Sequence, residues 1–110
     1  MILSLDYISK AVNGEIVKGD KRAHIYSVTT DSRQLSPKSL FIALIGEKYN
    51  GHDFVCTALD EGANAAIISE KIDGFQNIKK DKAVIRVDDT LQALQDLAKT
   101  YREQFQIPII

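Results

Sequence analysis

The chain has 110 residues, with 14 Lys and Arg against 15 Asp and Glu, which gives a formal net charge of -1. Hydrophobic residues make up 45% and charged residues 26% of the sequence, a composition typical of one globular domain with a single core. The near-neutral charge argues against a general affinity for nucleic acid or anionic membranes, and the single cysteine, Cys56, excludes an internal disulfide framework.

The first third of the chain predicts one helix and two strands. Ser4 is suited to cap a helix whose apolar face runs from Leu5 to Val12, and Gly14 is expected to end that helix. Residues 15–17 are predicted as a short strand, and residues 25–30 as a longer one.

The middle of the chain predicts a buried strand followed by a loop and a helix. Residues 40–45 form an uninterrupted apolar run, which is typical of a strand buried on both faces. Residues 46–51 have the composition of a loop and contain two glycines. A helix is then expected with His52 or Asp53 as its N-cap and with Gly62 as its end.

The last third predicts two more strands, at residues 65–69 and 84–87, with a short helix around residues 74–78 between them. Residues 89–92 match a capping box that begins a long helix. Its expected buried side chains are Leu91, Leu94, Leu97, Ala98, Tyr101 and Phe105. Strands that alternate with helices predict an α/β domain, a small sheet of short strands flanked by helices.

The end of the sequence, Ile107-Pro108-Ile109-Ile110, looks like the start of a further strand, so we expect a truncation there. An edge strand that closes the sheet is the alternative. The N-terminus lacks the features of a signal peptide and no apolar run is long enough to span a bilayer, so we expect a cytoplasmic protein without membrane insertion.

The sequence contains no motif that predicts an independent active site. It has neither the G-x-x-x-x-G-K-[ST] loop that binds ATP phosphates nor the G-x-G-x-x-G dinucleotide fingerprint. His24 and His52 lie far apart in the sequence, and no third metal ligand is suggested by their spacing. We therefore expect no catalytic residue, metal or cofactor in these 110 residues.

Two polar loops, each after a predicted strand, are the candidates for ligand binding. The first loop consists of Thr30, Asp31, Ser32 and Arg33. The carboxyl end of a strand is the usual place for ligands in α/β sheets, and the planar guanidinium of Arg33 suits a phosphate or a base edge. The alternative is structural: Asp31 and Ser32 cap a turn, while Arg33 pairs with Asp31 or another carboxylate.

The second loop consists of Gly46, Glu47, Lys48, Tyr49, Asn50, Gly51 and His52. Its glycines allow close approach of the backbone to a ligand, Tyr49 is suited to stack on a base, and Lys48 is suited to meet a phosphate. The alternative is a solvated loop in which Asn50 and His52 prepare the start of the next helix.

These loops carry a resemblance to a known family. The chain resembles the N-terminal, UDP-binding domain of Mur ligases over essentially its whole length. The resemblance rests on Val28-Thr29-Thr30-Asp31-Ser32-Arg33, Pro37-Lys38-Ser39-Leu40-Phe41-Ile42-Ala43-Leu44, Gly46-Glu47-Lys48-Tyr49-Asn50-Gly51-His52-Asp53-Phe54 and Gly62-Ala63-Asn64-Ala65.

The resemblance implies a parent enzyme that joins D-Ala-D-Ala to UDP-N-acetylmuramoyl-tripeptide in peptidoglycan synthesis. ATP and Mg²⁺ would be bound by the central and C-terminal domains of the same parent chain, so residues 1–110 alone are expected to be inactive. This domain would bind the UDP moiety through the two loops. The family branch that adds the third peptide residue is one alternative, and a stand-alone α/β interaction module is another.

Two positions depart from the family pattern. Lys38-Ser39 stands where the family usually has Gly-Asp, so the backbone of that turn is expected to differ. Asn50 replaces a common Asp, which keeps a hydrogen-bond acceptor and removes a charge.

Overall fold

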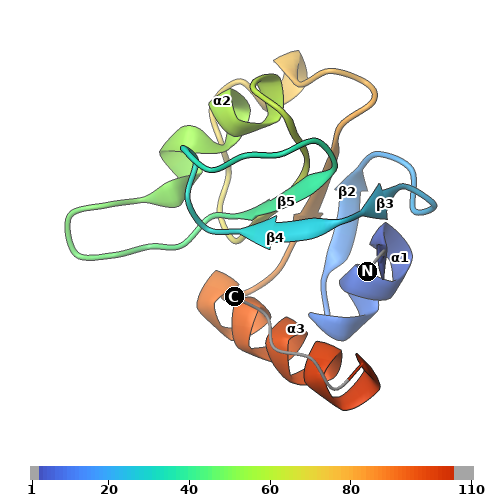
Figure 1. Cartoon of the computed structure of the whole chain (residues 1–110). Coiled ribbons are helices and arrows are strands. Elements are labelled where there is room, and N and C mark those ends of the chain that lie inside the picture. The colour runs from blue at the N-terminus through green and yellow to red at the C-terminus, as the bar shows by residue number, and fades with distance from the viewer. Residues whose placement is uncertain (1–2, 106–110) are drawn as a thin grey trace.

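The computed structural model of the chain describes residues 3–105, without the side chains of Tyr101 and residues 103–105. It is an α/β fold with a five-stranded sheet and helices on both faces, as the sequence predicts (Figure 1). The strands are β1 (Leu3–Ser4), β2 (Glu15–Lys18), β3 (His24–Ile25), β4 (Ser27–Thr29), β5 (Ser39–Ile42), β6 (Ala63–Ile68) and β7 (Ala83–Arg86). The helices are α1 (Leu5–Ala11), α2 (Val55–Asp60) and α3 (Thr90–Phe105), with short 3₁₀ helices η1 (Gly51–Phe54) and η2 (Phe75–Asn77).

The large sheet has the strand order β2-β7-β6-β5-β4. Strands β4, β5, β6 and β7 are parallel to one another, whereas β2 is antiparallel to β7. The remaining strands, β1 and β3, form a separate antiparallel pair. Because β4 and β5 are adjacent and parallel, their carboxyl ends, and therefore the two candidate loops, leave the same edge of the sheet.

The core consists of two apolar clusters, one on each face of the large sheet. Leu40 and Ile42 of β5 point to the cluster that α1 and α3 complete, and Phe41 points to the opposite cluster under α2. Figure 1 shows α2 on one side of the sheet and α3 on the other. The all-buried burial pattern of β5 is the one predicted for a strand covered on both faces.

Helix α1 begins at its predicted cap, since the hydroxyl of Ser4 accepts a hydrogen bond from the Tyr7 backbone N–H at 3.1 Å. It ends differently from the prediction, because the left-handed residue after the helix is Asn13, with φ 54°, and not Gly14. A glycine is needed at position 14 for another reason. A Cβ there would lie 2.6 Å from Cγ2 of Ile85, so the absent side chain lets the chain pass close to β7.

The single strand predicted over residues 25–30 is wrong, because the chain changes sheets at Tyr26. Ile25 is buried and pairs with Leu3 of β1, whereas β4 begins at Ser27 and pairs with β5. The exposed Tyr26 links the two segments through a hydrogen bond from its N–H to the carbonyl of Lys38 at 2.9 Å. Ile25 and Val28 contact the same apolar cluster although they are three residues apart, so the alternation of one continuous strand is interrupted at this point.

The buried strand predicted to reach Ile45 ends earlier, at Ile42. Ile45 is 56% exposed and forms an antiparallel bridge with Asn50. The Gly51 N–H also donates to the Leu44 carbonyl at 2.7 Å. The backbone after β5 thus pairs with its own loop and leaves the sheet.

The turn before β5 contains Lys38, one of the two positions at which the sequence differs from the expected family pattern. Lys38 has φ 61°, the left-handed conformation that glycine adopts without strain. Its Nζ lies 4.8 Å from the centre of the Tyr26 ring, a cation–π contact that offsets part of this strain. The lysine is therefore held in a backbone conformation suited to glycine.

Helix α3 buries part of the predicted stripe: Leu97 is buried and Leu94 packs against the core, as expected, but Leu91 is not buried. Thr90, Ala93 and Leu97 are buried, whereas Leu91 is 52% exposed. Asp89 caps the helix by accepting hydrogen bonds from the N–H groups of residues 91 and 92, but the Gln92 side chain bonds Asp96 and does not complete the capping box. The side chains of Tyr101 and Phe105 and the strand expected at residues 107–110 lie outside the described residues.

Candidate functional site

The first loop is organised around a paired aspartate and arginine. The Asp31 carboxylate accepts hydrogen bonds from Nε and Nη2 of Arg33, at 3.1 and 3.2 Å, and from the Arg33 backbone N–H at 2.9 Å. These hydrogen bonds lower the pKa of Asp31. The structural alternative for this loop is therefore present: Arg33 pairs with Asp31 across a turn. The pair remains open to ligands, because the Arg33 side chain is 87% exposed.

The turn that holds this pair begins at the end of β4. The Thr29 hydroxyl accepts a hydrogen bond from the Asp31 N–H at 3.0 Å. Thr30, Asp31 and Ser32 are half-buried. The strand end therefore fixes the backbone from which the carboxylate and guanidinium project.

The second loop turns back on itself and exposes an aromatic ring. The Gly46 N–H donates to the Tyr49 carbonyl at 2.6 Å, which closes the turn over Glu47 and Lys48. The Tyr49 ring stacks on Phe54, with ring centroids 5.4 Å apart and an angle of 14° between the planes. Tyr49 still has 43% of its surface exposed. Residues 46–49 thus form the solvent-facing part of the loop.

The other end of the second loop is held by hydrogen bonds, most of them partly buried. Asn50 Oδ1 accepts from the His52 N–H at 3.0 Å and lies 2.8 Å from His52 Nδ1. His52 Nε2 accepts from the Ser69 N–H at 2.9 Å, and Asn50 Nδ2 donates to Glu70 Oε1 at 2.7 Å. Burial lowers the pKa of His52, because the imidazolium form loses its hydration.

These contacts correct the expected start of the helix after this loop. Asn50, not His52 or Asp53, provides the side-chain cap, and the turn that it caps is η1. Helix α2 follows with Phe54 at its N-cap position and no side-chain cap. His52 is only 6% exposed, so its ring belongs to the interior of the loop.

The two loops leave the same edge of the sheet. The hydrogen bond and the charge of Asp31 raise the pKa of Arg33. Both loops follow strands that end at the same edge of the sheet, with the second loop extending outward in green in Figure 1. Arg33 and Tyr49 thus lie in loops that follow the same edge of the sheet.

The loops border different hollows in the surface. Thr30 and Asp31 line a hollow of about 660 Å³ between β4 and helix α3. His52 lines a smaller hollow of about 190 Å³ that it shares with Asp53 and Glu70. Arg33 and the exposed residues 46–49 lie outside both sets of lining residues.

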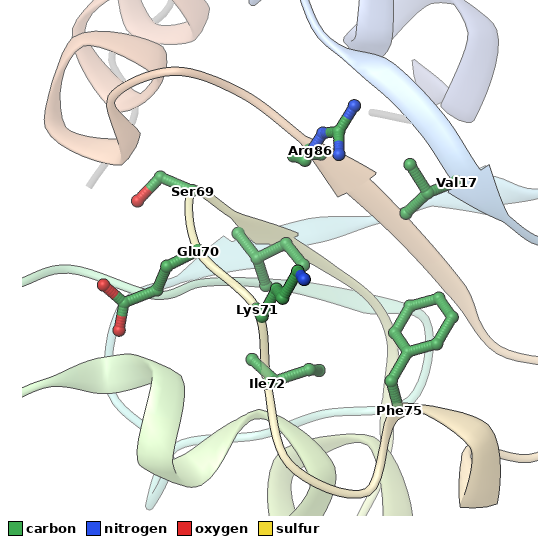
Figure 2. A pocket seen from close by; sticks show the side chains of 8 residues that line it. Val17, Ser69, Glu70, Lys71, Ile72, Phe75 and Arg86 are labelled. Atoms are coloured by element: carbon green, nitrogen blue, oxygen red, sulfur yellow. The ribbon is translucent and has the colours of Figure 1, made fainter.

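A third hollow, of about 460 Å³, was not predicted from the sequence. It lies at the carboxyl ends of β6 and β7, where Phe75 and Val17 form an apolar wall and Lys71 and Arg86 add positive charge (Figure 2). Arg86 also pairs with Glu15 at 3.3 Å. The residues that line this hollow come from four separate segments of the sequence, so no local motif predicts it.

Sequence comparison identifies the family. The family model described as "Mur ligase family, catalytic domain" matches residues 24–102, well over half of the chain and including both loops. The chain belongs to the Mur ligase family.

Individual relatives of this Mur ligase chain agree with that assignment. A UDP-N-acetylmuramoyl-tripeptide--D-alanyl-D-alanine ligase of Bacillus subtilis is 39% identical over 102 residues, which cover 87% of this chain and 22% of that ligase. A UDP-N-acetylmuramoyl-L-alanyl-D-glutamate--2,6-diaminopimelate ligase of Clostridium perfringens is 27% identical over 97 residues, which cover 88% of this chain and 19% of that ligase.

The fold of this Mur ligase chain is also found in solved structures. A crystal structure of MurF from Acinetobacter baumannii superposes with a TM-score of 0.80 at 30% sequence identity, and the match covers 94% of this chain and 22% of that one. The chain therefore spans about a fifth of the length of the relatives that it matches.

The described part of this Mur ligase chain offers no group of three or more His, Cys, Asp or Glu side chains placed to hold a metal ion. The sequence has no G-x-x-x-x-G-K-[ST] loop either. No helix among residues 3–105 is long and apolar enough to cross a membrane.

Proposed function

We propose that residues 1–110 form the domain that binds the UDP end of UDP-N-acetylmuramoyl-tripeptide in a ligase that adds D-Ala-D-Ala. ATP and Mg²⁺ would be bound by other domains of the full-length protein. The observation that carries this proposal is the position of the two loops, which follow adjacent parallel strands at one edge of the sheet and carry an exposed guanidinium and an exposed aromatic ring. The similarity to ligases with this named substrate supports the choice of ligand.

Arg33 has the chemistry to bind a diphosphate while it stays paired. A guanidinium has five N–H donors, and Asp31 engages two of its nitrogens, Nε and Nη2. The donors that remain are available for phosphate oxygens, and the bond to Asp31 keeps the fork oriented before the ligand arrives. In this proposal, the pairing with Asp31 is therefore part of the binding site.

Tyr49 has the chemistry to bind the base. Its stack with Phe54 fixes the plane of the ring, and its 43% exposure leaves surface for a second stacking partner. Lys48, which is exposed in the same turn, adds a positive charge for the phosphates. Binding at this remote end of the substrate would position the reacting carboxylate for chemistry elsewhere in the enzyme.

Titration of the ¹⁵N-labelled chain with UDP tests this proposal. The amide signals of Thr30–Arg33 and Gly46–Tyr49 should shift, and Arg33→Ala should weaken UDP binding about three- to tenfold, through loss of a charge-assisted hydrogen bond. Arg22→Ala is the matched control, because Arg22 forms the same kind of pair with Asp20, two residues before it.

The control should leave the affinity for UDP unchanged. Equal weakening by both variants would mean that only overall charge matters, and shifts confined to other surfaces would contradict the site. With the full-length ligase, a comparison of D-Ala-D-Ala and diaminopimelate as amine substrates would separate the two branches of the family.

A further inference from the structure

We propose that Glu70 is a positioning residue for the second loop, and that it acts through Asn50 and His52. Glu70 lies just beyond β6 and belongs to neither candidate loop, but its Oε1 accepts the 2.7 Å hydrogen bond from Asn50 Nδ2. The inference rests on the proposed function, because it assigns Glu70 the task of shaping a loop that binds UDP.

The hydrogen bonds around Asn50 and His52 define a single arrangement of donors and acceptors. The Ser69 N–H donates to His52 Nε2, so this nitrogen carries no proton and Nδ1 does. His52 Nδ1 then donates to Asn50 Oδ1, which also accepts from the His52 backbone N–H. The NH₂ group of Asn50 must therefore face outward, and Glu70 provides its acceptor.

Glu70 is directed to the loop and not to the neighbouring hollow. Figure 2 shows its carboxylate pointing away from Phe75 and Arg86, although Glu70 is among the residues that line that hollow. Its negative charge also lies 3.7 Å from His52 Nδ1, on the side where the ring carries its proton. The carboxylate therefore serves both partners in the loop.

Glu70 also favours asparagine over aspartate at position 50. An aspartate in the same place would set a carboxylate oxygen 2.7 Å from Glu70 Oε1, where the amide nitrogen now lies. Two carboxylates at that distance repel each other, so Asn50 and Glu70 form a matched pair in this chain. An aspartate at position 50 would therefore require a compensating change at Glu70.

The network determines which part of the second loop meets a ligand. Asn50 is half-buried and His52 is buried. Their side chains form hydrogen bonds with each other, and they also bond Glu70 (from Asn50) and the Ser69 N–H (to His52). Residues 46–49 are exposed. The pair with Glu70 thus anchors one end of the loop so that its exposed end, with Tyr49, has a defined position.

Amide hydrogen exchange tests the anchor without any ligand. In Glu70→Ala, exchange at the His52 and Ser69 amides should become about three- to tenfold faster, because the hydrogen bonds that protect them lose their support. Glu70→Gln should restore slow exchange, because its amide oxygen still accepts from Asn50. Glu61→Gln, a change at an exposed glutamate after α2, is the matched control and should have no effect.

A double-mutant cycle tests the matched pair. Asn50→Asp alone should accelerate exchange at both amides and weaken UDP binding. Adding Glu70→Gln should restore both properties, because the glutamine NH₂ donates to the new carboxylate. The ¹⁵N shifts of the His52 ring should report the Nδ1–H tautomer in the wild-type chain and in the restored double variant.

The outcomes separate the positioning role from the proposed function. Unchanged exchange in Glu70→Ala, or faster exchange with unchanged UDP affinity, would overturn the role of Glu70. A failure of the double variant to recover would overturn the matched pair. A wild-type chain that shows the predicted exchange but no UDP binding would instead contradict the proposed function.

Discussion

At the scale of single residues, His52 links the stability of the chain to pH. Its ring is buried and neutral, with Nε2 accepting from the Ser69 N–H, and burial lowers its pKa in the folded state below the ordinary value of 6.5. Protonation of His52 would place a hydrogen on the nitrogen that now accepts. The unfolded chain therefore binds the proton more readily than the folded chain does.

We expect the free energy of unfolding to fall as the pH is lowered from about 7.5 to about 5.5, with a contribution from His52 of at most about 1.4 kcal/mol per pH unit. The His52 contribution is fully present above the ordinary histidine pKa and is lost as the pH falls toward its folded value. Urea unfolding at several pH values measures this slope. His52→Gln should flatten it, while His24→Gln, a change at an exposed histidine, should leave it intact.

An equal slope in wild-type and His52→Gln chains would contradict this link. The comparison is best made above pH 5, since the lowered pKa values of Asp20 and Asp31 make the stability fall further in more acidic solution.

The roles of individual residues were only partly predictable from the sequence. The pairing of Arg33 with Asp31 was foreseen as an alternative, because the two lie close in the chain. The environment of His52 was not predicted from the sequence, because its partners Ser69 and Glu70 follow the end of another strand, β6. Local patterns describe neighbours in the sequence, and this network joins residues 17 to 20 positions apart.

At the scale of secondary-structure elements, Gly14 determines how closely α1 and β2 approach β7. A methyl group at this position would meet Cγ2 of Ile85 at 2.6 Å and Cγ1 of Val87 at 2.9 Å, both in the packed interior. The backbone here does not have a positive φ, so the constraint is space and not conformation.

Gly14→Ala should therefore destabilise the chain by about 1–3 kcal/mol, the usual cost of overpacking. Gly46→Ala is the control for stability, since the nearest atom to its Cβ would be 3.6 Å away, and it should change the free energy of unfolding by less than about 0.5 kcal/mol. Chemical denaturation of both variants makes the measurement. Similar losses of stability in the two variants would show that the contacts with Ile85 and Val87 do not restrict side-chain size at position 14.

The elements themselves were largely predictable, and the exceptions share a cause. Apolar alternation and capping residues located α1, β5, β6, β7 and α3. The break at Tyr26 and the exposure of Leu91 depend on which partner each segment meets, and periodicity within a segment does not contain that information.

At the scale of the whole molecule, the two apolar clusters share one sheet. Leu97 lies in the cluster under α1 and α3, and Leu59 in the cluster under α2, each 1% exposed. Because β5, β6 and β7 contribute side chains to both clusters, loss of packing on one face removes support from the other.

We expect Leu59→Ala and Leu97→Ala each to lower the free energy of unfolding by about 2–5 kcal/mol while leaving a single transition. Urea unfolding followed by circular dichroism and by NMR signals from both faces checks this. A biphasic curve in either variant, with one face melting first, would show that the clusters are separate folding units.

The edges of the large sheet bear on how the chain behaves at high concentration. Within the described residues, the edge strands are β2 and β4. Strand β4 has only three residues, and Leu94 and Ala98 of α3 border the hollow beside it, while β2 carries charges at both ends, Glu15 and Lys18. Short or charged edges are poor templates for strand addition, so the same architecture that displays the two loops also discourages self-association into extended β-structure.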